Sequence, residues 1–203
     1  MHFYNSVGPN PQVVRMFMAE RGIEVPQTTV DLRGGENRRA EYMAKNPFGQ
    51  LPCLELDDGS FLAEITAICE YLDETTPGMS LIGANAKERA ETRMWVRRLD
   101  LNVLEPLANG FRFSQGIKLF QNRIHVIPQA ADDLKLTAQK NLTWLDGQMA
   151  GKTWICGNRF TLADVLLYCF LAFGAAVGQP LNPENTNLLA WFDRVKARPS
   201  SAA

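Results

Sequence analysis

The spacing of hydrophobic and polar residues divides the chain into a first part with short mixed elements and a second part with long helices. Within residues 1–75, four short runs have the composition of strands: residues 1–6, 24–32, 51–56 and 59–64. Runs with helical periodicity alternate with them, at residues 11–22, 37–46 and 64–74. In the last run, the apolar positions 65, 68, 69 and 72 share one helix face. The predicted order is therefore β-α-β-α-β-β-α.

The remainder of the chain is predicted to be helical. Residues 76–85 contain turn formers without periodicity, which indicates a linker. Pro106 is expected to kink or end the first helix, and two glycines in residues 108–116 predict a loop. The predicted helices are residues 86–110, 128–149, 161–177 and 187–199. We therefore predict an α/β domain in residues 1–75, a linker in 76–85 and an all-helical domain in 86–203.

Charge and composition narrow the possible partners. The net charge of −1 gives no electrostatic reason to expect nucleic acid or an anionic membrane as a partner. The most apolar run, residues 161–177, includes Asp164 and is shorter than the roughly 20 residues of a membrane span. We expect it to be a buried helix, begun by a capping box from Thr161 to Asp164. The N-terminus lacks the features of a secretory signal.

The cysteines and histidines argue against a metal site. The four cysteines lie in apolar stretches and form no CxxC pair, which predicts buried thiols in a reducing compartment and thus a cytoplasmic location. His2 and His125 are the only histidines, so no metal is expected. Cys53 is interpreted as a small buried hydrophobe, with a redox thiol as the alternative.

Pro52 is the most informative residue of the first domain. Residues 46–59, NPFGQLPCLELDDG, have the pattern of a strand and an Asp-Gly turn, yet a proline stands where the strand begins. A cis bond between Leu51 and Pro52 would turn the chain and leave the Leu51 N–H and C=O unpaired. An extended peptide would then be able to pair with Leu51 like an added strand. A trans proline at a sheet edge is the alternative.

The stretch FGQLPCLELDDGSFLAEITAICEYLDE, residues 48–74, resembles the core signature of the cytosolic glutathione transferase family. The matching positions are Gly49, Leu51, Pro52, Leu54, Asp58, Gly59, Leu62, Glu64, Ala67, Ile68, Tyr71 and Leu72. Residues 13–23, 34–47, 157–167 and 188–200 also resemble that family. The resemblance implies a thioredoxin-like N-terminal domain and an all-α C-terminal domain, the glutathione transferase fold. It also implies glutathione as a co-substrate, no further cofactor, and a homodimer.

For glutathione, the resemblance assigns the pairing of its cysteinyl main chain to Leu51 and the direction of that pairing to Pro52. Gln50 stands where the family places a side chain near the glycine carboxylate. The γ-glutamyl group is assigned to Glu64 and the helix start that follows it, where free N–H groups attract a carboxylate. The alternative for Glu64 is a solvated carboxylate favoured by the helix dipole.

One position departs from the family pattern. The serine that usually follows Glu64 is Ile65 in this chain, and Thr66 is only a partial substitute. A hydroxyl donor to the γ-glutamyl carboxylate is therefore missing. Since a hydrogen bond to a charged group contributes about 1.5–3 kcal/mol, we expect glutathione binding to be weakened and not abolished.

The sequence identifies the residue that activates the glutathione thiol less clearly than it identifies the binding residues. Family members use a Tyr, Ser or Cys near the start of the first helix, because the thiolate is the nucleophile. Positions 8–11 contain no Ser or Cys, so we rank Asn10 first, then Ser6, then Tyr4, with ordinary turn and strand residues as the alternative. The segment Gly8-Pro9-Asn10 is similar to the Thr-Pro-Asn loop of the bacterial nu class, which favours reduction of disulfides or peroxides over conjugation.

The second substrate is expected to be a small hydrophobic electrophile or a disulfide, bound between the domains. The candidate contacts are Met16, Trp95, Leu99, Phe111 and Phe113, with core packing as the alternative for each. Ile65 and the missing Ser or Cys leave a second functional hypothesis open. It is a non-catalytic module of the same fold that binds glutathione or another protein.

Overall fold

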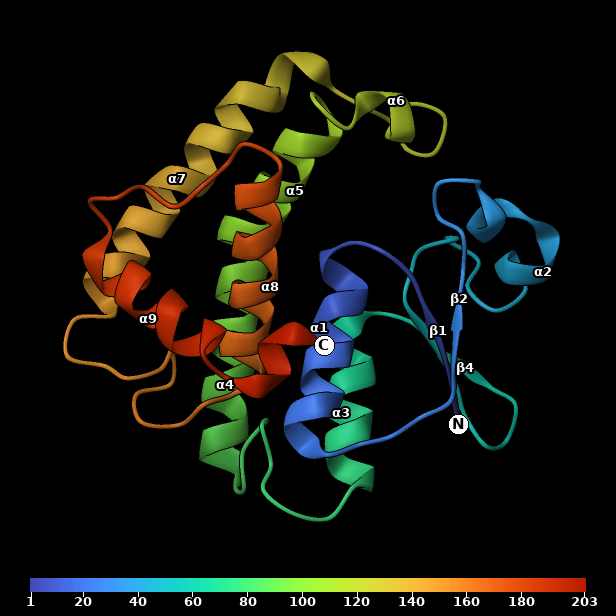
Figure 1. The fold of residues 1–203 in the computed structure, drawn as a ribbon, viewed down its shortest axis with the longest axis horizontal. Coiled ribbons are helices and arrows are strands. Elements are labelled where there is room, and N and C mark those ends of the chain that lie inside the picture. The colour runs from blue at the N-terminus through green and yellow to red at the C-terminus, as the bar shows by residue number, and fades with distance from the viewer. The chain divides into compact units, whose positions relative to one another are not determined.

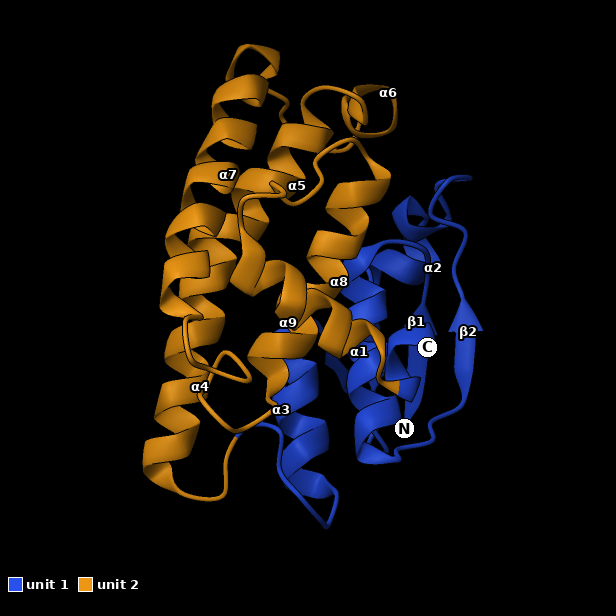
Figure 2. Ribbon diagram, turned by 60° about the vertical axis from the view of Figure 1, so that its left-hand side comes forward, with its two compact units in different colours: residues 1–82, 199–203 blue, residues 83–198 orange.

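The computed structural model describes all 203 residues, and the chain divides into two compact units. Unit 1 comprises residues 1–82 together with 199–203, and unit 2 comprises residues 83–198 (Figure 2). Residues 76–82 of the predicted linker thus belong to unit 1, and residues 83–85 belong to unit 2. No helix combines the length and the apolar composition needed to cross a lipid bilayer.

Unit 1 is a four-stranded sheet with helices on both faces. Its elements are β1 (His2–Asn5), α1 (Pro9–Arg21), β2 (Gln27–Thr29), a 3₁₀ turn (Glu36–Arg38), α2 (Ala40–Met43), β3 (Cys53–Glu55), β4 (Phe61–Leu62) and α3 (Ile65–Thr75). The strand order is β2-β1-β3-β4, with β1 parallel to β2 and the other pairs antiparallel. Helices α1 and α3 lie on one face of the sheet and α2 on the other (Figure 1). The predicted β-α-β-α-β-β-α order and the thioredoxin-like fold are confirmed.

The local sequence explains where α1 begins and ends. Pro9 and Pro11 stand in its first turn, where no hydrogen-bonded N–H is required. Gly22 ends the helix in the left-handed conformation, with φ 63°, which a residue without Cβ adopts at little cost. The side chains of Val13, Val14 and Phe17 are fully buried, so this helix supplies much of the core of unit 1.

Unit 2 is entirely helical, as predicted. Its helices are α4 (Ala86–Leu99), α5 (Glu105–Arg112), α6 (Ile117–Phe120), α7 (Ala131–Gln148), α8 (Leu162–Ala176) and α9 (Thr186–Lys196), with a 3₁₀ turn at Pro128–Ala130. Helix α5 packs along α7, while α8 packs against α4 and α9. Most side chains of α8 are buried, which agrees with its nearly continuous apolar sequence. A third 3₁₀ turn, Pro199–Ala202, belongs to unit 1 and packs on α1.

Two predictions about the first long helix need correction. Pro106 does not end it: a π-helical turn, Asp100–Leu104, separates α4 from α5, and Pro106 lies in the first turn of α5, where a proline is tolerated. The loop predicted over residues 108–116 is wrong in its first half, because α5 continues to Arg112. Gly110 lies inside this helix, and a Cβ there would approach Lys135 Cγ to 2.7 Å, so glycine permits the close packing of α5 on α7.

The buried carboxyl group of Asp164 organises the start of α8. Its Oδ1 accepts hydrogen bonds from Ile155 N–H and from the Trp191 indole N–H, both at 2.9 Å. Its Oδ2 accepts from Thr161 N–H at 2.9 Å, which completes the predicted capping box. Burial raises the pKa of Asp164 to about 6. One carboxyl group therefore joins α8, α9 and the segment before α8.

Candidate functional site

The strand pairing of unit 1 gathers the predicted glutathione residues at one end of the sheet. Extending the antiparallel register of β1 with β3 by one residue places Asn5 opposite Pro52. Extending the register of β3 with β4 by two residues places Glu64 opposite Pro52 as well. The end of β1, the residues before β3 and the start of α3 therefore meet at this end, and α1 begins four residues after β1.

The residue before Pro52 has a main chain available for pairing. The Leu51–Pro52 peptide bond is cis, as predicted. Strand β3 begins only at Cys53, and no group of the chain bonds to the Leu51 N–H or C=O. The Leu51 side chain is buried in the cluster of Val30, Tyr42 and Cys53. Side-chain packing thus fixes Leu51, while its polar main-chain atoms remain available.

The start of α3 presents free N–H groups beside this edge. The first intrahelical bond is donated by Ile68 N–H to Glu64 C=O, so the N–H groups of Ile65, Thr66 and Ala67 have no acceptor within the chain. Glu64 is exposed and its side chain does not cap the helix. Its φ of 67° places a residue with a Cβ in a region that glycine normally occupies. Such strain is concentrated at binding and catalytic sites.

The Gln50 side chain is exposed, while its main-chain carbonyl is occupied. That carbonyl accepts hydrogen bonds from the Tyr42 hydroxyl at 2.7 Å and from Asn46 Nδ2 at 2.9 Å. The side-chain amide makes no hydrogen bond within the chain and is available to a ligand.

The three candidates for thiol activation differ in what their polar groups do. Asn10 lies in the first turn of α1, half-buried, and its side-chain amide bonds to no group of the chain. The Ser6 hydroxyl is buried and donates to Val30 C=O at 2.8 Å. The Tyr4 hydroxyl donates to Glu55 Oε2 at 2.7 Å. Since a hydroxyl has one proton to donate, the Ser6 and Tyr4 hydroxyls are already engaged, and Asn10 is the one candidate of the three whose side-chain donor is free.

The surroundings of Tyr4 and Cys53 disfavour their ionised forms. Partial burial of Tyr4 and its bond to Glu55 raise the pKa of its phenol. Cys53 is fully buried, and burial raises the pKa of its thiol to about 11. All four cysteines are free and buried, as predicted. Because the thiolate is the reactive form, the interpretation of Cys53 as a small hydrophobe is the one its environment supports.

Most residues predicted to contact the second substrate are core residues instead. Met16 and Leu99 are 1% and 2% exposed, so no ligand can reach them in this conformation. Trp95 is also buried, and its ring is approached by Trp144, Arg98 and Lys152. The period of an amphipathic helix marks such positions as buried, and it does not distinguish core from substrate contact.

A half-buried aromatic cluster in unit 2 is more accessible than Met16, Trp95 and Leu99, and is therefore a better candidate for contact with an apolar substrate. Phe111 lies at the centre, with its ring 5.2 Å from that of Phe173 and 6.2 Å from that of Phe120, both edge to face. Phe113, the other predicted aromatic, is more deeply buried. Phe120 and Phe173 were missed because they belong to different helices, and nothing in the sequence shows that they meet.

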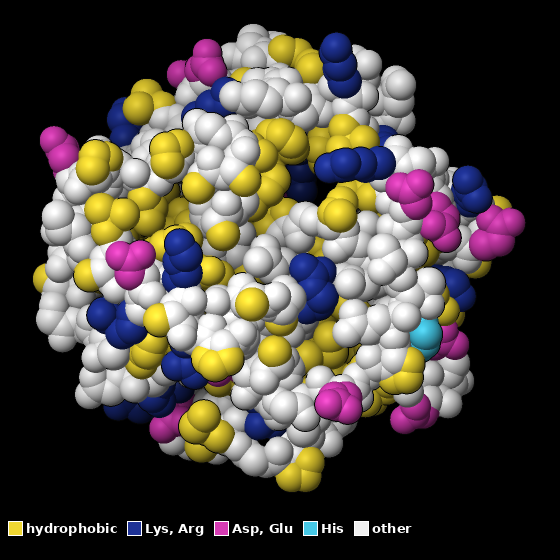
Figure 3. Space-filling view, viewed as in Figure 1, with side chains coloured by type: hydrophobic (Ala, Val, Ile, Leu, Met, Phe, Trp, Pro, Cys, Tyr) yellow, Lys and Arg dark blue, Asp and Glu magenta, His cyan; other side chains and the backbone are white.

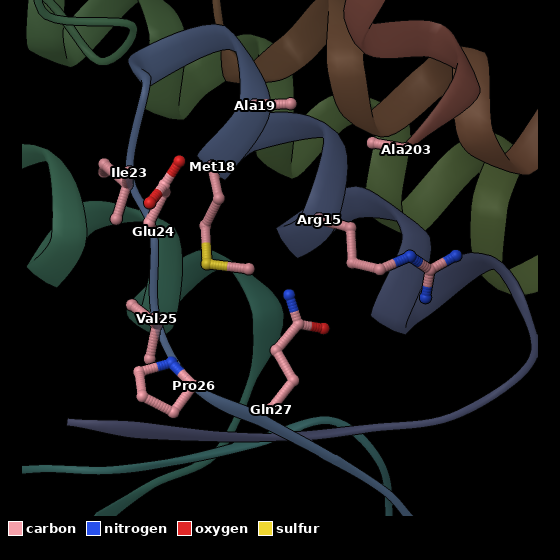
Figure 4. A pocket seen from close by; sticks show the side chains of 9 residues that line it. All are labelled: Arg15, Met18, Ala19, Ile23, Glu24, Val25, Pro26, Gln27 and Ala203. Carbon is pink, nitrogen blue, oxygen red and sulfur yellow. The ribbon is translucent and has the colours of Figure 1, made fainter.

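A hollow in unit 1 lies away from the predicted site residues. This hollow has a volume of about 690 Å³. Figure 4 shows its lining side chains, which come mainly from α1 and the segment leading into β2. Its walls include Arg15, Met18, Glu24, Val25 and Gln27, and none of the predicted site residues lines it. On the face drawn in Figure 3, basic and acidic side chains are interspersed. No group of three or more metal-ligating side chains is assembled in the structure.

Comparison with known proteins finds the same family in both units of the chain. Residues 7–75 match the family described as glutathione S-transferase, N-terminal domain, and residues 119–199 match glutathione S-transferase, C-terminal domain. Glutathione S-transferase 2 of Saccharomyces cerevisiae is 31% identical over 200 residues, covering 95% of this chain and 84% of that protein. Glutathione S-transferase GstA of Escherichia coli O157:H7 is 31% identical over 189 residues, covering 90% and 86%.

The three-dimensional structure of this chain also resembles that of a solved protein. The crystal structure of a glutathione S-transferase domain-containing protein from Marinobacter aquaeolei VT8 aligns with a TM-score of 0.93 at 36% identity. The alignment covers 99% of this chain and 100% of that one.

Proposed function

Because the chain belongs to the glutathione S-transferase family, we propose that it binds glutathione at the Leu51 edge and activates the glutathione thiol for reaction with a hydrophobic electrophile or a disulfide. The observation that carries this proposal is the unpaired main chain of Leu51 beside the uncapped start of α3. Both features occur at the same end of the sheet, and each supplies a kind of bond that a peptide with two carboxylates requires.

In this proposal each part of glutathione has its own partner. The cysteinyl N–H and C=O pair with Leu51 C=O and N–H in antiparallel fashion. The γ-glutamyl carboxylate accepts from the free N–H groups of Ile65 and Thr66, where the helix dipole also favours negative charge. Glu64 accepts from the γ-glutamyl ammonium, and the Gln50 amide donates to the glycine carboxylate. Pairing with Leu51 then fixes the direction in which the thiol points.

The thiol chemistry is assigned to Asn10. Its side-chain amide is available as a donor, and an amide donor stabilises the thiolate. The thiol pKa is thereby lowered, and the thiol proton is released to solvent because an amide cannot accept it. The thiolate attacks the electrophilic atom of the second substrate and the leaving group departs with the displaced electron pair. With a mixed disulfide of glutathione, attack on the glutathione sulfur yields glutathione disulfide and releases the substrate thiolate.

The aromatic cluster of Phe111, Phe120 and Phe173 is proposed to contact the hydrophobic part of the second substrate. We further propose that the protein forms a homodimer and acts in the cytoplasm. Retention on glutathione-agarose without turnover of either an aromatic chloride or a mixed glutathione disulfide would instead indicate a non-catalytic binding module.

Replacing Asn10 by Ala is expected to lower kcat by roughly 10–100-fold, because a donor to a charged sulfur contributes about 1.5–3 kcal/mol. The dissociation constant of glutathione should change less than about threefold, since Asn10 contacts only the sulfur. Steady-state kinetics and isothermal titration calorimetry measure the two quantities. Asn122→Ala, an exposed amide in unit 2, is the control. An unchanged kcat in Asn10→Ala would show that Asn10 does not stabilise the thiolate.

Replacing Ile65 by Ser is expected to tighten glutathione binding by about tenfold, because it adds a hydroxyl donor at the first residue of α3. Ile65→Ala removes the same side chain without adding a donor, so it serves as the matched control. Titration calorimetry of the two variants compares them directly. Equal affinities in Ser and Ala variants would mean that the γ-glutamyl carboxylate does not lie at this helix start.

A further inference from the structure

We propose that Asn37, Tyr42 and Asn46 are positioning residues that hold residues 48–50 so that the main chain of Leu51 remains open to glutathione. This inference rests on the proposed function, because it concerns the same edge. It adds residues that do not touch the ligand and that neither the sequence pattern nor the family resemblance singled out as part of the site.

Three successive main-chain carbonyls before Leu51 are occupied by side chains. Arg38 Nη1 donates to Phe48 C=O at 3.1 Å, and Asn37 Nδ2 donates to Gly49 C=O at 2.6 Å. Gln50 C=O accepts the Tyr42 hydroxyl at 2.7 Å and Asn46 Nδ2 at 2.9 Å. These donors come from the 3₁₀ turn, from α2 and from the loop that follows α2. The carbonyls of residues 48, 49 and 50 thus each accept a side-chain donor, whereas the next carbonyl, that of Leu51, has no partner.

Burial protects the hydrogen bonds of Asn37, Tyr42 and Asn46 from competition by water. Asn37 is 1%, Asn46 3% and Tyr42 4% exposed, so water does not compete for their donors. A carbonyl in a regular strand would be satisfied by a neighbouring strand, which would also occupy the edge. Here side chains satisfy the carbonyls of residues 48–50. No neighbouring strand is needed, and the first unpaired main-chain groups are those of Leu51.

The backbone of Gly49 is adapted to the same arrangement. Its φ is +60°, and a Cβ at this position would lie 2.8 Å from Asn37 C=O. Gly49 N–H donates to Asn46 C=O at 2.8 Å, which closes a tight turn directly before Gln50. The glycine three residues before Pro52 therefore allows the close approach on which the side-chain bonds to residues 48–50 depend.

The test separates positioning from simple stabilisation. Tyr42→Phe removes one hydroxyl and keeps the ring, and Asn46→Ala removes the second donor to the same carbonyl. We expect each variant to raise the glutathione dissociation constant by roughly 3–10-fold and the double variant by more, with kcat at saturating glutathione changed less than about twofold. Val25→Ala, which removes buried methyl groups elsewhere in unit 1, is the control for a loss of stability alone. Calorimetric titration, kinetics and urea unfolding are measured on the unaltered protein and on all four variants.

The outcomes distinguish this inference from the function on which it rests. If the unaltered protein binds no glutathione, the proposed function fails and the positioning role fails with it. If the unaltered protein binds and the Tyr42 and Asn46 variants bind equally well, only the positioning role is overturned. A Val25→Ala variant that weakens binding as much as Tyr42→Phe at equal loss of stability would also overturn it. Because Tyr42→Phe changes a single oxygen atom, it retains the packing of the ring and is expected to fold.

Discussion

Replacing Asp164 by Ala is expected to lower the free energy of unfolding by about 3–5 kcal/mol. The carboxyl group is fully buried and accepts bonds from Ile155 N–H, Thr161 N–H and the Trp191 indole N–H, each at 2.9 Å. Its removal leaves three buried donors without an acceptor, and each such donor costs about 1–3 kcal/mol. Urea unfolding followed by circular dichroism measures the difference.

Two further variants make the test of Asp164 specific. Asp164→Asn retains the shape and one acceptor oxygen but turns an amide N–H₂ toward a donor, so its loss should be smaller than that of Ala. Asp132→Ala deletes a carboxylate whose side chain is 98% exposed and should change stability by less than about 0.5 kcal/mol. A loss below about 1 kcal/mol in Asp164→Ala would contradict the assigned role.

Replacing Arg21 by Met is expected to lower the free energy of unfolding by about 3–5 kcal/mol, because it leaves a buried carboxylate unpaired. The Arg21 guanidinium lies 3.0 Å from Asp73 Oδ1, and the two side chains are 4% and 5% exposed. Arg21 also donates to Thr76 C=O and Met79 C=O, both at 2.6 Å. Arg21, at the end of α1, thus bonds both to α3 and to the segment that follows α3.

The same measurement on two other variants tests the explanation. Arg21→Lys retains the charge but cannot reproduce the forked set of bonds, so we expect an intermediate loss. Arg97→Met removes a cation that is 67% exposed and pairs with Asp100 at 3.4 Å, and it should be close to neutral. Equal stabilities of Arg21→Met and Arg97→Met would show that the buried pair does not stabilise unit 1.

Periodicity and turn chemistry were sufficient to predict the order of elements. Pro11, Gly22 and the Thr161–Asp164 box marked helix ends that the structure confirms, because each acts through its own local backbone. The π-helical turn before Pro106 and the continuation of the helix from residue 110 to Arg112 were not predictable in this way. There, the packing of α5 along α7 outweighs the weak helix propensity of glycine at position 110.

The candidate site was predictable where it consists of main chain and only in part where it consists of side chains. Pro52 marked the edge at Leu51 because a proline at a strand start changes the backbone directly. Ser6 and Tyr4 could not be excluded from sequence, since their acceptors, Val30 C=O and Glu55, are 24 and 51 residues away. The donors of Tyr42 and Asn46 to Gln50 were missed for a different reason, because side chains that support a loop leave no periodic signal.

The most direct test of the proposed glutathione site is a crystal structure of the protein with glutathione bound. We expect the cysteinyl N–H and C=O of the ligand to lie about 2.9 Å from the C=O and N–H of Leu51, with the γ-glutamyl carboxylate at the first N–H groups of α3. Glutathione bound at another place, or bound here with the Leu51 main chain still unpaired, would contradict the account.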